Sequence, residues 1–275
     1  MKTAKTESIF GSDRAVIGMV HLRALPGTPA GQDPLQRIAQ EAVREARMLV
    51  DAGFDAIMLE NMHDVPYLKR EVGPEIISSM TAIAGEVRRA VDVPMGIQVL
   101  AGANTASLAI AHATGCQFIR AEGFVFASIA DEGAMLDADA GPLLRYRRSI
   151  GAEHVHVLAD IRKKHTSHAI TSDLGISDWA HAAEFAGADG VIVTGTATGR
   201  SVEPSELQAA AGSTSCPVIV GSGATSEDLD LLLQHADAVI VGSSLKIDGH
   251  WANPMDQSRV EQFMEAATLA RSSRT

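Results

Sequence analysis

Short apolar runs rich in β-branched residues recur along the whole chain and predict buried strands. The predicted strands cover residues 15–22, 54–61, 94–100, 118–123, 154–161, 190–195, 217–223 and 238–244. Between them, apolar residues return with the spacing of one helix face, as at Leu35, Ile38, Ala42, Ala46 and Leu49. The chain therefore alternates strand and helix from one end to the other.

Eight strands alternating with helical segments predict an α/β fold, a single (β/α)8 TIM barrel domain of the phosphate-binding type over residues 1–275. An open doubly wound sheet is the structural alternative. That fold favours a GxGxxG turn after its first strand, and the chain has "HLRALPG" there. No linker or low-complexity tract divides the sequence, which indicates one domain.

The connections between predicted elements differ in length. Those from helix to strand are short, whereas those after the first, second, fourth, fifth and eighth strands are long. These long loops lie at the carboxyl ends of the strands, where barrel enzymes carry their active sites. The asymmetry favours an enzyme over a plain scaffold.

Two Gly- and Ser-rich loops follow the last two predicted strands, "GSGATSEDL" at 221–229 and "VGSSLKIDG" at 241–249. Small residues let backbone amides approach an anion, and barrels commonly bind phosphate with these two loops. The predicted phosphate-binding residues are Gly221, Ser222, Gly223, Gly242, Ser243 and Ser244. Lys246 is expected to add positive charge. In the alternative interpretation the loops only form turns and caps, with Ser226 as a helix N-cap.

Polar residues cluster at the predicted carboxyl ends of the strands. Period-two alternation places Arg120 and Glu122 on the strand face of Phe118, and Asp160 on that of Leu158. The predicted catalytic residues are His21, Glu60, Arg120, Glu122, Asp160, Lys164 and His165, and the predicted substrate-binding residues are Asn61, Gln98, Thr194 and Thr196. Crowded carboxylates differ in pKa, which suits acid–base chemistry. The alternative is a structural ion pair of Arg120 with Glu122 or Glu60.

The stretch "DIRKKHTSH" at 160–168 follows the fifth predicted strand. Lys163, Lys164 or His165 is expected to reach a ligand at the barrel mouth. A lysine near a carboxylate binds phosphate, acts as a base or forms a Schiff base, and the sequence leaves these roles open. A solvated basic loop is the plain alternative.

Metal ligands are not evident in the sequence. "HTSH" lacks a third and a fourth zinc ligand, so no metal site is assigned and no particular cofactor is predicted. A magnesium ion held by Glu60, Glu122 or Asp160 remains open. The segments 120–148 and 195–204 are interpreted either as lids over a ligand or as surface loops.

Composition narrows the class of partner. The 275 residues carry a net charge of −11, which argues against a general nucleic-acid binder. No run approaches the roughly 20 apolar residues of a membrane span. The two cysteines, Cys116 and Cys216, form no CxxC pair and are expected to be reduced. We therefore expect a cytoplasmic homo-oligomer that binds a phosphorylated small molecule.

Taken together, several motifs over about residues 15–265 resemble the BtpA family, described as photosystem I biogenesis proteins. These motifs are "GMVHLRALPGTP", "GFDAIMLENMHDVPY", "GIQVLAGA", "FIRAEGFVFA", "LLRYRR", "VLADIRKKH", "TGTATG" and "VGSSLK". The resemblance implies a barrel related to ribulose-phosphate-binding enzymes, and family members also occur beside sugar-processing genes. The matching candidate residues are His21, Glu60, Asn61, Arg120, Asp160, Lys164 and His165. Where the family often has D-Q-G, this chain has Asp131-Glu132-Gly133.

Three functions follow as hypotheses. The first is an enzyme that isomerises, epimerises or cleaves a sugar phosphate, in which Glu60 or Asp160 takes a proton and Arg120 or Lys164 stabilises the enediolate. It predicts that Asp160→Asn abolishes turnover and leaves the fold intact. The second is metal-assisted hydrolysis of a phosphoester or glycosidic bond. The third is a non-enzymatic factor for photosystem or complex biogenesis, or for regulation.

Overall fold

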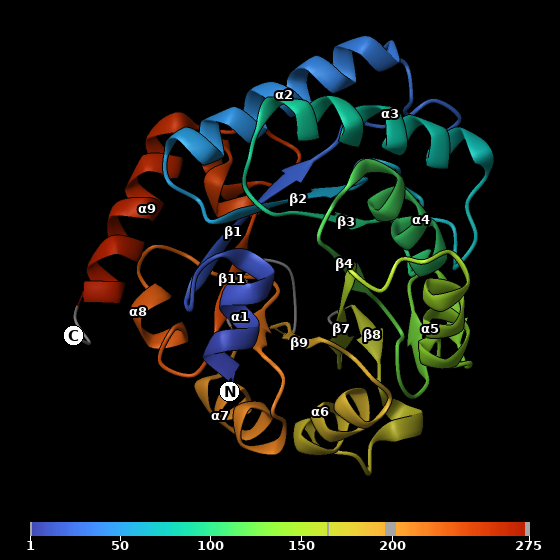
Figure 1. The fold of residues 1–275 in the computed structure, drawn as a ribbon, viewed down its shortest axis with the longest axis vertical. Helices are drawn as coiled ribbons and strands as arrows, with labels where there is room; N and C mark the ends of the chain where they lie inside the picture. The colour runs from blue at the N-terminus through green and yellow to red at the C-terminus, as the bar shows by residue number, and fades with distance from the viewer. Residues whose placement is uncertain (1, 164, 196–201, 273–275) are drawn as a thin grey trace.

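The computed structural model describes residues 2–163, 165–195 and 202–272. Within these residues, eight parallel strands close into a barrel, which confirms the predicted TIM-barrel fold (Figure 1). The barrel strands are β1 (Ala15–His21), β2 (Ala56–Glu60), β3 (Met95–Gln98), β4 (Phe118–Ala121), β7 (His156–Ile161), β9 (Gly190–Val193), β10 (Val218–Val220) and β11 (Ala238–Val241). Strands β11 and β1 pair from Ala15 and Ala238 onward and close the ring.

Most strands are shorter than the apolar runs that predicted them. Phe54 precedes β2, and Val99 and Leu100 follow β3, yet all three side chains are buried. They are apolar because they pack into the core without strand pairing, as where the Phe54 ring stacks on Phe263 of the last helix. Hydrophobicity therefore marks burial, and it does not mark where a strand ends.

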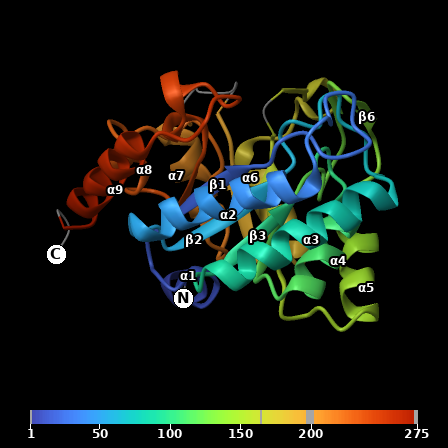
Figure 2. The same cartoon turned by 90° about the horizontal axis from the view of Figure 1, so that it is seen from above.

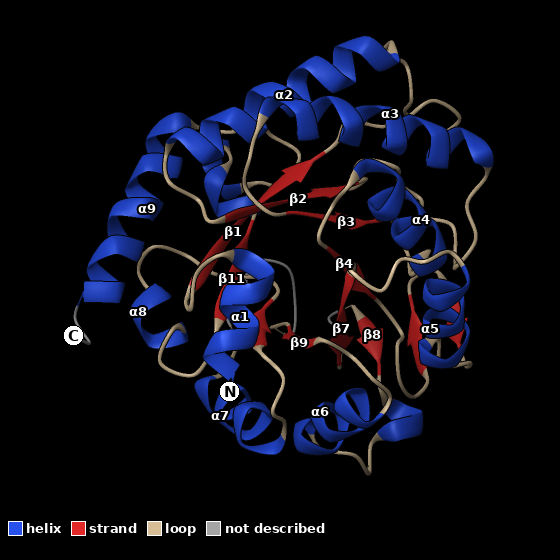
Figure 3. Cartoon of the chain, in the orientation of Figure 1, coloured by secondary structure: helices blue, strands red, loops and turns tan. Residues whose placement is uncertain are grey.

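Helices surround the barrel (Figures 2 and 3). They are α2 (Leu35–Asp51), α3 (Pro74–Ala90), α4 (Asn104–Thr114), α5 (Ala140–Ser149), α6 (Ile176–Phe185), α7 (Pro204–Ser213), α8 (Leu229–Leu232) and α9 (Gln257–Ser272), with short 3-10 turns η1 (Ala169–Thr171), η2 (Ser243–Leu245) and η3 (Ile247–Gly249). Helix α8 begins at Leu229 with Asp228 as its N-cap, so Ser226 does not cap it.

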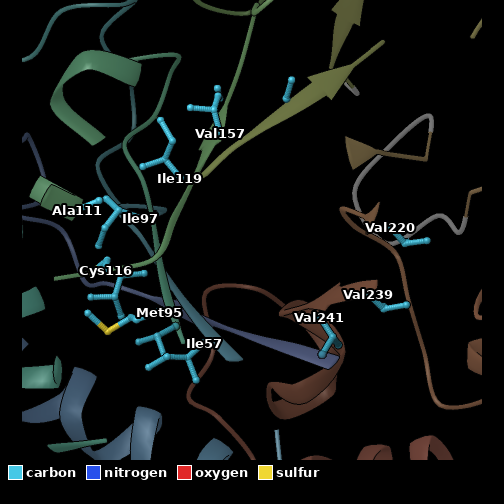
Figure 4. Packing of buried hydrophobic residues seen from close by; sticks show 14 of the residues in the cluster. Ile57, Met95, Ile97, Ala111, Cys116, Ile119, Val157, Val220, Val239 and Val241 are labelled. Carbon is cyan, nitrogen blue, oxygen red and sulfur yellow. The ribbon is translucent and has the colours of Figure 1, made fainter. Parts of the chain in front are cut away.

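Alternate residues of each strand face different apolar layers. Ile57, Ile97 and Val157 point outward and join the layer between strands and helices, where Ala111 of α4 lies beside Ile97 (Figure 4). Phe118 belongs to a second cluster inside the barrel. This alternation determines which side chains point into the barrel. At the carboxyl ends of the strands the inward-pointing side chains are polar, so polar groups gather at the barrel mouth.

Helix α1 (Lys2–Phe10) precedes the first barrel strand and was not predicted from the polar N-terminal sequence. Its buried residues Ile9 and Phe10 belong to the cluster inside the barrel. The Phe10 and Phe118 rings meet edge to face with centroids 5.3 Å apart. Figure 2 shows α1 at one end of the barrel and β6 at the other. The helix therefore closes the amino-terminal end.

A polar rim fixes the strand register at that closed end. Residues just before several strands form two hydrogen bonds to the first or second residue of a neighbouring strand, one through the backbone and one through the side chain. For example, the backbone N–H of Val218 donates to Asp237 Oδ2 (2.8 Å), and Asp237 N–H donates to the Val218 carbonyl (2.8 Å). We call each such pair of hydrogen bonds a rim bracket. The residues that make one include Asp55, Gln117, Asp189 and Asp237.

At the opposite end, loops that follow β4 and β7 form a small antiparallel sheet. Its strands are β5 (Ser128–Ala130), β6 (Gly133–Met135) and β8 (Thr166–Ser167), in the order β6-β5-β8. The pairing of Ile129 with Ser167 joins the two loops. Part of the segment interpreted as a lid or surface loop, 120–148, is thus a paired hairpin. In the other such segment, residues 196–201 lie outside the described residues.

Candidate functional site

A cavity of about 750 Å³ lies at the carboxyl end of the barrel. The predicted residues that line it are His21, Glu60, Gln98, Arg120, Glu122, His165, Gly221, Ser222, Gly223, Gly242, Ser243 and Ser244. Asn61, Asp160 and Thr194 do not line it, and Lys164 and Thr196 lie outside the described residues. The fold therefore brings most of the predicted polar groups and both Gly-Ser loops to one space.

Arg120 and Asp160 form a buried ion pair beside this cavity. The Arg120 Nε donates to Asp160 Oδ2 (3.0 Å), and Nη2 lies 3.0 Å from Oδ1. Arg120 Nη1 donates to the Gly221 carbonyl (3.0 Å). Burial lowers the pKa of Arg120, but the Asp160 charge outweighs it and raises that pKa above its ordinary value. Asp160, and not Glu122 or Glu60, is thus the ion-pair partner, and Arg120 positions the first Gly-Ser loop.

Asn61 is occupied by structural hydrogen bonds. Its Nδ2 donates to Asp64 Oδ2 (2.8 Å), and its Oδ1 accepts from the Leu100 N–H (2.7 Å). Asp64 Oδ1 in turn accepts from the Leu25 N–H (2.8 Å). Asn61 therefore ties together the loops after three strands and lies away from the cavity lining. Thr194 is also buried, at the end of β9, and packs beside the first Gly-Ser loop.

Glu122, Gln98 and Lys163 form a polar cluster in the cavity. Glu122 Oε1 accepts from Gln98 Nε2 (3.0 Å) and lies 2.9 Å from Lys163 Nζ. Burial lowers the pKa of Lys163, but the carboxylates of Glu122 and Asp160 outweigh it and raise that pKa. Glu122 Oε2 and Gln98 Oε1 are buried and have no hydrogen-bond partner in the described part of the chain. Leaving such an atom unpaired costs about 1–3 kcal/mol, which is typical of a site completed by a ligand.

The backbone of the loop after β7 explains why Lys163 reaches the cavity. Strand β7 ends at Ile161, and Arg162 and His165 then adopt left-handed backbone, with φ of 49° and 56°. His168 Nε2 lies 3.0 Å from the Lys163 carbonyl and fixes the loop. Period-two alternation stops where the strand stops, so the sequence pattern could not choose among the neighbouring lysines.

His21 and Glu60 face each other on the neighbouring strands β1 and β2. The His21 Nε2 and Glu60 Oε2 atoms are 3.5 Å apart, and both side chains are nearly buried. A Cβ at position 242 would lie 3.0 Å from His21 Nε2, so glycine there makes room for the imidazole. His21 Nδ1 lies 3.4 Å from the carbonyl of Trp251, a lining residue that sequence reasoning missed.

The Gly-Ser side of the cavity has different chemistry. Ser222 Oγ is buried and has no hydrogen-bond partner among residues 2–163, 165–195 and 202–272. Arg259 on α9 lines the cavity and donates to the Ser244 carbonyl (3.3 Å). Arg259 lies outside the strand-end loops that the sequence pattern highlighted, which is why it was not predicted.

Lys246 does not add charge to this side. Its side chain is buried, and Nζ donates to Glu45 of α2 at 3.0 Å and 2.9 Å from the two carboxylate oxygens. The expected contribution to phosphate binding is therefore wrong. The ion pair instead holds the loop after η2 against α2.

The positions of the His, Cys, Asp and Glu side chains decide whether the site could hold a metal ion. No group of three or more His, Cys, Asp or Glu side chains is placed to hold a metal ion within the described ranges. Of the carboxylates considered for magnesium, Asp160 is bound by Arg120, and Glu122 binds Gln98 and Lys163.

No described helix combines the length and apolar character needed to span a membrane.

Comparisons with known proteins place the chain among relatives. The model of the BtpA family matches residues 12–269. An uncharacterized mitochondrial protein of Caenorhabditis elegans, F13E9.13, is 44% identical over 255 residues, covering 91% of each chain. The photosystem I biogenesis protein BtpA of Synechocystis is 36% identical over 260 residues, covering 94% of this chain and 89% of the relative.

Solved structures share the fold at low identity. The (S)-3-O-geranylgeranylglyceryl phosphate synthase of Thermoplasma acidophilum, in complex with sn-glycerol-1-phosphate, matches with a TM-score of 0.61 and 16% identity, covering 97% and 98% of the two chains. A thiamine phosphate pyrophosphorylase of Pyrococcus furiosus matches with a TM-score of 0.59 and 11% identity, covering 96% and 98%. These likenesses concern the barrel fold.

Proposed function

The chain belongs to the BtpA family, and we propose that its barrel is an enzyme that moves protons within a phosphorylated small molecule. The reaction class is isomerisation, epimerisation or aldol-type cleavage of a sugar-phosphate-like substrate. The observation that carries this proposal is one cavity with two unlike sides. Buried carboxylates and a lysine line one side, and two Gly-Ser loops with Arg259 line the other.

The Gly-Ser side suits a phosphate group. Its small residues let backbone amides approach an anion closely, and Ser222 and Arg259 add a hydroxyl and a cation. The structural neighbours include proteins named for phosphorylated compounds, among them a synthase bound to sn-glycerol-1-phosphate. Their fold supports a phosphate at this side of the barrel.

The other polar side chains of the cavity suit proton transfer next to a carbonyl. Glu60, with His21 at 3.5 Å, acts as the base that removes a proton from carbon. Lys163 stabilises the negative charge that develops on the carbonyl oxygen as the enediolate forms. Asp160 and Arg120, which the sequence offered for these two roles, are engaged with each other.

Proton exchange tests this proposal directly. Candidate sugar phosphates are incubated with the protein in D2O, and deuterium incorporation at carbon is followed by NMR. We expect exchange with the wild-type protein and a loss of at least about 100-fold in Glu60→Gln and Lys163→Met, in line with the usual contribution of one acid–base group. Glu86→Gln, which removes an exposed carboxylate from α3 outside the cavity lining, is the matched control and should retain exchange.

A second function is favoured by the Synechocystis relative, which is named a photosystem I biogenesis protein. An assembly factor would bind a protein partner and would not exchange protons in any phosphorylated compound. If no phosphorylated compound raises the Tm at high excess, while affinity capture retains a defined protein complex, the enzyme proposal fails and the assembly role gains support.

A further inference from the structure

The unpaired atoms of Gln98 and Glu122 have a fixed hydrogen-bonding character. Gln98 Nε2 donates to Glu122 Oε1 at 3.0 Å, so the Gln98 amide oxygen is the atom that is left over. Rotating the amide would place that oxygen against a carboxylate oxygen, which is repulsive. Both leftover atoms, Gln98 Oε1 and Glu122 Oε2, are therefore acceptors without a donor.

Among the described residues, the nearby cations Lys163 and Arg120 already have other partners. Lys163 Nζ lies on the other carboxylate oxygen, Glu122 Oε1, at 2.9 Å. Arg120 bonds Asp160 through Nε and Nη2, and the Gly221 carbonyl through Nη1. Gln98 and Glu122 are each only 1% exposed, and both line the cavity. A molecule in the cavity is thus the natural source of the missing donors.

We infer that Gln98 and Glu122 make this site selective for a phosphate monoester whose far end carries hydrogen-bond donors, hydroxyl or amino groups, and not a carboxylate. The inference rests on the proposed function, because it takes the phosphate to occupy the Gly-Ser side. Gln98 and Glu122 are then specificity-determining residues, separate from Glu60 and Lys163.

The reason for the selectivity is electrostatic. A hydroxyl or amino group donates to Gln98 Oε1 and Glu122 Oε2 and completes both. A carboxylate brings two more acceptors and a negative charge beside buried Glu122, and Glu60 lines the same cavity. A site built around buried hydrogen-bonding groups rejects a ligand that leaves them unpaired by far more than a missing methylene would cost. Polyol phosphates and amino-polyol phosphates fit, and phosphorylated carboxylic acids do not.

Matched ligand pairs test the inference by titration calorimetry. Glycerol 3-phosphate and 3-phosphoglycerate differ only in a hydroxymethyl against a carboxylate, as do ribitol 5-phosphate and ribonate 5-phosphate. We expect the polyol phosphate of at least one pair to bind about tenfold or more tightly than its acid. The inference is wrong if both acids bind as tightly as their polyols. An amino-deoxyribitol 5-phosphate shows whether hydroxyl or amino donors are preferred.

Variants assign the selectivity to these side chains. Gln98→Met removes one acceptor, and Glu122→Gln removes the charge with little change in shape. Each should reduce the polyol-to-acid affinity ratio to about threefold or less. Glu86→Gln, the same change of charge at an exposed position of α3 outside the cavity lining, should leave the ratio unchanged. If Glu122→Gln does not fold, Gln98→Met alone decides, and a ratio that survives Gln98→Met overturns the assignment.

Failure of the phosphate site is distinguishable from failure of this inference. Inorganic phosphate alone reports on the Gly-Ser side. If neither phosphate nor any phosphate ester binds, the proposed function loses its anion site, and ribitol is then compared with ribonate. A preference for ribitol that is lost in Gln98→Met upholds the selectivity without the phosphate, and equal or absent binding of the two overturns it.

Discussion

Arg120 and Asp160 are both nearly inaccessible to solvent, with side chains 6% and 0% exposed. Removing one partner of a buried ion pair leaves the other charge buried and unpaired, which typically costs about 3–5 kcal/mol. The sequence had suggested that Asp160 acts on a ligand and that Asp160→Asn would leave the fold intact. Its position away from the cavity lining and its bidentate contact with Arg120 indicate a structural role instead.

We therefore predict that Asp160→Asn lowers the free energy of unfolding by about 3–5 kcal/mol. Urea unfolding followed by circular dichroism measures the change. Glu132→Gln, at the cavity but only partly buried, is the control and should change stability by less than about 0.5 kcal/mol. A loss below about 1 kcal/mol in Asp160→Asn would show that the Arg120 guanidinium is accommodated without its partner.

Most site residues of the barrel interior and of the two Gly-Ser loops were accessible to sequence reasoning, whereas Trp251 and Arg259 were not. His21, Glu60 and Gln98 were found because they lie at the ends of predicted strands, and Glu122 because strand alternation places it on the face of Phe118. Lys163 follows a left-handed residue beyond the strand, where no periodicity operates. The pattern also cannot distinguish a residue whose hydrogen bonds are made with its neighbours, such as Asn61, from one that faces a cavity.

At the scale of elements, the rim brackets set neighbouring strands in register. Asp189 and Asp237 make the same pair of backbone contacts, to Val157 and to Val218. Their surroundings differ. Asp189 also bonds Arg147 (2.7 Å). Burial raises the pKa of Asp189, but hydrogen bonds with His156 and Val157 and the Arg147 charge outweigh it and lower that pKa below its ordinary value. Burial dominates at Asp237 and raises its pKa.

These opposite pKa shifts predict opposite pH dependence. A carboxylate with a lowered folded-state pKa stabilises the fold above its unfolded pKa and loses that contribution as the pH falls through the folded value. The stability lost in Asp189→Asn, about 1–3 kcal/mol at pH 7, should therefore shrink as the pH falls below about 4. For Asp237→Asn the loss should instead shrink as the pH rises above about 4.

Denaturant unfolding of both variants and the wild type between pH 3 and 7 measures these differences. The paired variants control for the change that both share, the replacement of a carboxylate that accepts from a backbone N–H. Parallel pH profiles for Asp189→Asn and Asp237→Asn would contradict the different charge environments of the two brackets.

Element types were predicted far better than small additions to the barrel. The repeated alternation of strand and helix identified every barrel strand, because each is a buried apolar run. The β5, β6 and β8 strands are only two or three residues long, and one of their two pairings, that of β5 with β8, joins loops distant in sequence. Such short strands carry no periodicity of their own and form only because tertiary contacts hold the two loops together.

The whole molecule is a barrel closed at one end and open at the other. Helix α1 fills the amino-terminal end through Phe10, while the polar cavity occupies the carboxyl end. Stability and ligand binding are thereby placed at opposite ends of the same strands, as is general for this fold. Substitutions in helix α1 should therefore alter the stability of the fold and leave the shape of the site unchanged.

Phe10→Ala tests this separation. Phe10 is 1% exposed and its ring contacts Phe118 inside the barrel, so truncation leaves a cavity and should cost about 3–5 kcal/mol. For a chain of this size we expect the Tm to fall by roughly 6–15 °C. Phe185→Ala is the matched control, because that ring is 88% exposed and its loss should change stability by less than about 0.5 kcal/mol. Differential scanning calorimetry measures both. An equal Tm for the two variants would show that α1 does not close the barrel in solution, and a changed ligand affinity in Phe10→Ala would show that the two ends are coupled through the strands.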